Sequence, residues 1–155
     1  MKIKSVKIFA VLVIIFLFVN QTWAADWIGF ASNNLGDMYY DKSTIKKENK
    51  NIINVMIKQI LSREGKTKYF SFLEGIKKAP ENADKLHHAL VLQKIDCTNK
   101  KFKSSSIAFY GEKEDSLASQ QISAAEWNNI MPNTPPEALK NILCGSGKTT
   151  KKNKK

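Results

Sequence analysis

Residues 53–61 read Ile-Asn-Val-Met-Ile-Lys-Gln-Ile-Leu, and this stretch decides the fold class. Its apolar side chains alternate with polar ones at Asn54 and Lys58: Ile53, Val55, Ile57 and Leu61 are the apolar set. Because successive side chains of a strand point to opposite faces, a period of two indicates a half-buried strand. The sequence therefore predicts a protein built on a β-sheet.

Further strands are predicted on both sides of this stretch. The first lies in the stretch Met38–Ile45 and ends at Asp41-Lys42. The others cover Leu86–Cys97, Phe102–Tyr110 and Leu117–Ile122. The polar break Thr98-Asn99-Lys100 is short enough to join two of them as a hairpin. Residues 63–68 are expected to form a loop, and residues 69–76 fit either a strand or a short helix.

One helix is indicated near the C-terminal end. Thr134 is a favourable N-cap, Pro135 suits the first helical position, and Glu137 completes a capping box three residues after Thr134. An apolar stripe through Leu139 follows, and Gly145 provides a stop. We therefore expect an α+β, mainly β fold: an antiparallel meander sheet of five or six strands with a C-terminal helix tied by one disulfide.

The first 24 residues have the organisation of a secretory signal peptide. Three lysines precede an apolar run of 12 residues, Ile8 to Val19. A membrane-spanning helix takes about 20 residues, so a cleaved signal is favoured over an uncleaved anchor, which is the alternative. Small residues at positions 22 and 24 predict cleavage between Ala24 and Ala25. The first cysteine is Cys97, so no lipid attachment is expected at the new N-terminus.

The charge of the chain is concentrated at its ends. The formal net charge is +11, but three lysines lie in residues 1–24 and five in residues 148–155, which leaves +3 for residues 25–147. We expect residues 25–147 to form one domain, and residues 148–155 to be a disordered basic tail. The nearly balanced body argues against a nucleic-acid-binding protein.

The cysteine count predicts a single cross-link. An exported chain with two cysteines most simply joins them, so we expect a disulfide between Cys97 and Cys144. Free thiols and an intermolecular bridge are the alternatives.

No catalytic, cofactor-binding or metal-binding group emerges from the sequence. His87 and His88 are the only histidines, and neighbouring strand residues point to opposite faces, so we expect a solvent-facing pair. An acidic turn at residues 112–115 lacks the spacing of a calcium loop. We therefore expect a protein that is not an enzyme and carries no cofactor.

The order of the landmarks resembles that of a known family. Asp26-Trp27 opens the domain, Tyr39-Tyr40-Asp41-Lys42-Ser43-Thr44-Ile45 follows a glycine-containing turn, and Ile95-Asp96-Cys97 precedes a basic hairpin. Trp127, Ile130 and Pro132 then lead into a helix that closes on Cys144. This layout, over residues 26–144, resembles the surface-adhesin protein E family of bacterial envelope proteins.

The resemblance implies adhesion to host matrix or plasma glycoproteins, with dimers as a known assembly. We expect an exported binding module, periplasmic, secreted or at the cell surface, with a protein or glycoprotein partner. A homodimer belongs to the same expectation, and a structural or assembly role in the cell envelope is the alternative. Lys100, Lys101 and Lys103 form the basic hairpin that we expect to contact the partner; a solvated turn is the other interpretation of these lysines.

Overall fold

The computed structural model describes residues 25–122 and 126–145; the expected signal peptide and basic tail lie outside these residues. Its strands are β1 (Trp27–Asn33), β2 (Gly36–Asp41), β3 (Lys46–Lys47), β4 (Ile52–Leu61), β5 (His88–Asp96), β6 (Lys101–Tyr110), β7 (Ser116–Gln121) and β8 (Asn128–Asn129). Its α-helices are α2 (Arg63–Gly75) and α3 (Pro135–Cys144), and the 3₁₀ turns are η1 (Lys42–Thr44) and η2 (Ala83–Lys85).

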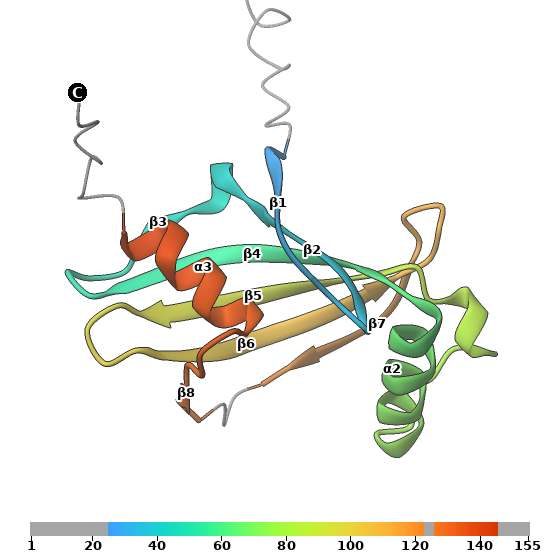
Figure 1. The fold of residues 1–155 in the computed structure, drawn as a ribbon. Coiled ribbons are helices and arrows are strands. Elements are labelled where there is room, and N and C mark those ends of the chain that lie inside the picture. Colours follow the sequence, from blue (N-terminus) through green and yellow to red (C-terminus); the bar gives the residue numbers. More distant parts are fainter. Residues whose placement is uncertain (1–24, 123–125, 146–155) are drawn as a thin grey trace, which may run out of the picture.

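The strands form one antiparallel sheet (Figure 1). Its order is β1-β2-β4-β5-β6-β7, while the short strands β3 and β8 pair with β4 and β6. The six principal strands are neighbours in the sheet in the order in which they follow one another in the chain, which confirms the predicted antiparallel meander of five or six strands. Alternation alone does not predict β1, because a bulge between Gly29 and Ala31 breaks its period.

Strand β4 lies in the middle of the sheet, with β2 on one side and β5 on the other. Every second side chain of β4 is buried: Ile53, Val55, Ile57, Gln59 and Leu61. The predicted alternation is therefore confirmed, with one departure, since the polar Gln59 occupies a position on the buried face.

Both helices cover the same face of the sheet. Leu139 of α3 packs against Val55, Ile57 and Ile95, and Leu73 of α2 packs in a second cluster. That second cluster contains Leu61, Leu86, Ala89 and Phe109. Every buried strand residue in these clusters points to the same face of the sheet as Val55. The opposite face therefore has no helix over it within residues 25–122 and 126–145.

Helix α2 begins where a loop was expected. The Ser62 side chain accepts a hydrogen bond from the Gly65 backbone N–H at 3.0 Å and so caps the helix. Gly65 allows the helix to approach the β1–β2 turn closely, since a Cβ there would lie 2.1 Å from the Leu35 carbonyl oxygen. The expectation for residues 63–68 was wrong, because burial of Leu73 and not helix propensity stabilises this segment.

Helix α3 begins and ends at the predicted residues, but its predicted capping box does not form. The Thr134 hydroxyl donates to the Met131 carbonyl at 2.6 Å, and the Glu137 carboxylate accepts from the Asn133 N–H at 2.8 Å. The Glu137 N–H already bonds the Thr134 backbone carbonyl at 3.0 Å. Since Pro135 and Pro136 have no N–H, the first helical turn offers the Thr134 hydroxyl no free donor to accept from.

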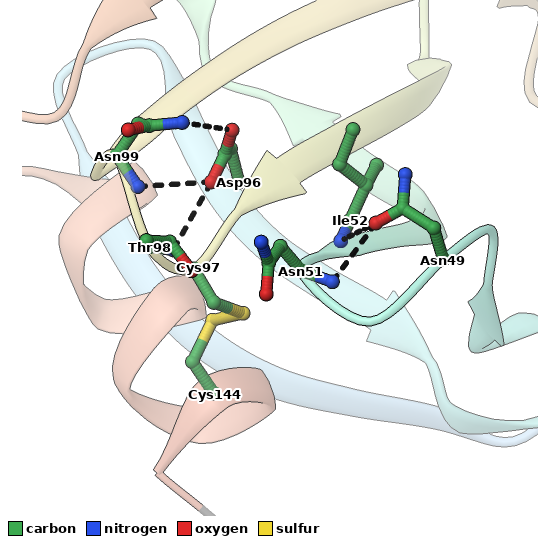
Figure 2. The surroundings of a disulfide bond; sticks show 8 residues. All are labelled: Asn49, Asn51, Ile52, Asp96, Cys97, Thr98, Asn99 and Cys144. Carbon is green, nitrogen blue, oxygen red and sulfur yellow. Dashed lines mark hydrogen bonds between the residues drawn. A yellow bond between two sulfur atoms is a disulfide. The ribbon is translucent and has the colours of Figure 1, made fainter.

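A disulfide joins Cys97, directly after β5, to Cys144, the last residue of α3 (Figure 2). The predicted pairing is confirmed, and both cysteines pack beside the cluster that contains Leu139. The Cys97 N–H donates to the Asn51 carbonyl at 2.9 Å, so the disulfide ties α3 to the end of the sheet where the turns before β4 and after β5 meet.

Candidate functional site

The uncovered face of the sheet is formed by the strand side chains that point away from the helices. Across its middle, Tyr39 of β2 lies opposite Lys58 of β4, which lies opposite Leu90 of β5. The next row places Met56 opposite Leu92. These side chains are half-buried among themselves, so the face offers apolar area interrupted by positive charge.

An aromatic ring and a lysine are held together at one edge of this face. The Lys58 Nζ lies 4.5 Å from the centroid of the Trp27 ring, a cation–π arrangement between β4 and β1. The contact orients both side chains on the same surface. An aromatic side chain fixed in this way can bury a large area on binding with little loss of conformational freedom.

The three lysines of the expected binding hairpin do not share one environment. Lys100 is exposed in the turn, with a positive φ of 52°. Lys101 and Lys103 are half-buried on β6, opposite Asp96 and Lys94 on the uncovered face. Lys103 also lies 4.9 Å from the centroid of the Trp127 ring. The hairpin is therefore continuous with the uncovered face, and two of its lysines have fixed neighbours.

Asp96 shapes the turn that carries these lysines (Figure 2). Its carboxylate accepts from the backbone N–H groups of Thr98 and Asn99 at 3.0 and 2.9 Å, and from Asn99 Nδ2 at 2.8 Å. The bonds from Asn99, with smaller contributions from Thr98 and Lys101, lower the pKa of Asp96 below 3.8. The carboxylate therefore stays ionised at neutral pH and fixes the hairpin.

Two further lysines contribute charge to the same face. Lys94 forms an ion pair with Glu48, and this hydrogen bond is the leading cause that lowers the pKa of Glu48. Alternation along a strand shows only that Lys58 and Lys94 point away from the apolar side chains of their own strands. Strand pairing was needed to show that they share a surface with Lys101 and Lys103, because the sequence alone does not give the register.

The histidines form a partly buried pair, which corrects the expectation that both face solvent. His88 is only 1% exposed; its ring stacks on Tyr110 at a centroid distance of 5.1 Å, and its Nε2 lies 3.4 Å from the Glu114 carboxylate. Its Nδ1 lies 3.2 Å from that of His87. Burial lowers the pKa of His88 and outweighs the opposing attraction of Glu114. His87 precedes β5, so the alternation rule does not separate the two rings.

Within residues 25–122 and 126–145, no group of three or more His, Cys, Asp or Glu residues could hold a metal ion. Over the same residues, no helix has the length and apolar character needed to cross a membrane.

Comparison with known proteins identifies the relatives of this arrangement. The sequence profile of the family described as surface-adhesin protein E matches residues 27–145. Crystal form II of Haemophilus influenzae protein E has a similar fold, with a TM-score of 0.53 and 14% identity over 79% of this chain and 90% of that one. Its selenomethionine form gives a TM-score of 0.54 and 16% identity over 79% and 92%. No curated protein matches the chain in sequence.

Proposed function

Because the chain belongs to the surface-adhesin protein E family, we propose that it is an exported, non-enzymatic protein that adheres to a protein or glycoprotein partner through the uncovered face of its sheet. The observation that carries the proposal is the placement of both helices on one face, which leaves the opposite face open to a partner.

The chemistry of the uncovered face supports a partner with acidic groups. The hairpin lysines Lys100, Lys101 and Lys103 adjoin a surface that also presents Trp27 and Lys58. Aromatic and apolar area supplies affinity at the centre of an interface, whereas charge at its rim speeds association and selects the partner. The same face is available to a second copy of the chain, so a homodimer would compete with the partner.

Export follows from the proposed domain organisation. Removal of residues 1–24 between Ala24 and Ala25 would leave one domain, residues 25–147, followed by a basic tail, residues 148–155. We propose a periplasmic, secreted or cell-surface location without a lipid anchor. The Asp41 carboxylate accepts a hydrogen bond from the Asp26 N–H at 3.0 Å, so the new N-terminus would begin next to a fixed point of the sheet.

A charge-reversal variant tests the binding surface. The full processed chain is compared with the triple variant Lys100→Glu, Lys101→Glu and Lys103→Glu against a panel of immobilised matrix and plasma glycoproteins, at low and at physiological salt. Three lost contacts of about 0.5–1 kcal/mol each predict a loss of affinity of at least about 10-fold, larger at low salt.

A matched control reverses three exposed lysines elsewhere: Lys68, Lys77 and Lys85. These lie on α2 and in the segment that follows it, so the control should bind as the parent does. Equal losses in both variants would mean that net charge and not this surface determines binding. Absence of binding to every glycoprotein, with the parent monomeric in sedimentation velocity, would overturn the adhesive function.

A further inference from the structure

A cavity of about 490 Å³ lies on the helix-covered face, where members of the two core clusters meet. Its walls are largely apolar and aromatic, with Phe30, Phe102 and Tyr69 among the lining residues. The Thr134–Pro136 segment, at the start of α3, forms part of the rim. This volume lies within the range of sites that hold small organic ligands.

One buried amide in this cavity lacks a hydrogen-bond partner. The side chain of Gln59 is part of the lining and is only 3% exposed. Its Oε1 accepts from the Tyr69 hydroxyl at 2.9 Å, but its Nε2 has no partner among the described residues. Burial raises the pKa of Tyr69, so its hydroxyl stays protonated at neutral pH. An unpaired buried N–H is costly, so in native proteins nearly every such group has a hydrogen-bond partner.

The remaining polar groups of the lining are neutral. Gln93 and Ser104 lie opposite each other on β5 and β6 and face the cavity with Gln59. No described residue of the lining carries a charge. A charged ligand would therefore be desolvated without a counter-charge, whereas a neutral ligand with an acceptor oxygen would satisfy Gln59.

We propose that this cavity binds a small neutral amphiphile, and that the buried Gln59 amide turns toward it so that Nε2 donates a hydrogen bond to the ligand's carbonyl oxygen. The apolar body of the ligand would lie against the aromatic walls. The site lies on the face opposite the proposed adhesive surface, so the two activities are independent.

Nile red, a neutral dye with a ring carbonyl, is the direct probe. The full processed chain should enhance its emission and shift it to shorter wavelength, saturating at one dye per chain. Ser104→Trp fills the cavity and should weaken binding at least 10-fold. Ser106→Trp is the matched control, because Ser106 lies opposite Leu92 on the uncovered face and should leave binding unchanged. Equal binding by both variants would place the dye elsewhere and overturn the proposal.

Competition defines the chemical class. Octanamide should displace Nile red at a concentration at least 10-fold lower than octanoate at pH 8, because only the carboxylate carries a charge into the cavity. Gln59→Met removes the donor at nearly constant volume and should weaken octanamide about 3- to 10-fold, the effect of one hydrogen bond. Equal potency of the two competitors, or full octanamide affinity in the Gln59 variant, would overturn the role of the amide.

Discussion

Removing the disulfide with Cys97→Ala and Cys144→Ala together should destabilise the domain by about 4 kcal/mol. The bridge closes a loop with a sequence separation of 47, and the chain-entropy relation converts a loop of this length into about 4 kcal/mol at 25 °C. Loss of the sulfur atoms beside the core removes a further fraction of a kcal/mol of apolar burial. In a domain of this size, the combined loss corresponds to a fall in Tm of roughly 15 °C.

Urea unfolding of three samples measures this quantity: the oxidised parent, the parent reduced with dithiothreitol, and the double alanine variant. The reduced parent should lose nearly as much stability as the variant, because both lack the cross-link in the unfolded chain. A difference between these two samples reports the packing of the sulfur atoms alone. A variant within 1 kcal/mol of the oxidised parent would refute the reasoning, because the cross-link would then not restrict the unfolded chain by the amount that the loop length predicts.

Three further substitutions test the packing and the titration of the domain. Gly36→Ala should cost about 2 kcal/mol or more, because Gly36 has a φ of 137° and a Cβ there would lie 1.9 Å from the Ile60 carbonyl oxygen. Gly75→Ala is the control, with nothing within 4 Å, and thermal unfolding should show equal or higher stability. Leu139→Ala should cost about 2–5 kcal/mol in urea unfolding, because the Leu139 side chain is 0% exposed. Burial lowers the pKa of His88 below 6.5 in the folded protein, so the unfolded protein binds the proton of this histidine at a higher pH than the folded protein does. The free energy of unfolding should therefore fall as the pH decreases from 6.5. His88→Phe should flatten this decrease between pH 6.5 and 5, and an unchanged slope would contradict the assignment.

Strand β4 was predictable because one physical pattern determines it. In β4 the apolar side chains that alternate from Ile53 to Leu61 are the ones that the helices bury, so the pattern and the packing agree. Helix α2 was not predictable in its first half, because Gly65 and Thr67 favour other conformations when considered alone. Its position depends on the Ser62 cap and on the close approach to the β1–β2 turn, both of which come from tertiary contacts.

The candidate binding surfaces required the register of the strands. The Lys100–Lys103 segment was visible as a basic hairpin, but Lys94 and Lys103 are recognisable as neighbours only once β5 and β6 are paired. The cavity left a weaker signal in the sequence: Gln59 interrupts the apolar series of β4, and Gln93 and Ser104 are polar residues on the same face of the sheet. Each of these three residues looks like an ordinary polar strand residue until the pairing of β4, β5 and β6 shows that all three line the same cavity.

Alternation along the strands makes the two proposed activities separable. Successive strand positions point to opposite faces, and the bulge between Ser104 and Ser106 shifts this alternation in β6. Ser104 therefore lies on the cavity side of the sheet and Ser106 on the uncovered face. A partner bound to the uncovered face would contact neither the rim at Thr134 nor the Gln59 amide. Charge reversal at the hairpin should therefore leave octanamide binding unchanged, and filling the cavity should leave glycoprotein binding unchanged. If either change altered the other activity, coupling would have to pass through the sheet itself, because the helices on one face do not reach the other.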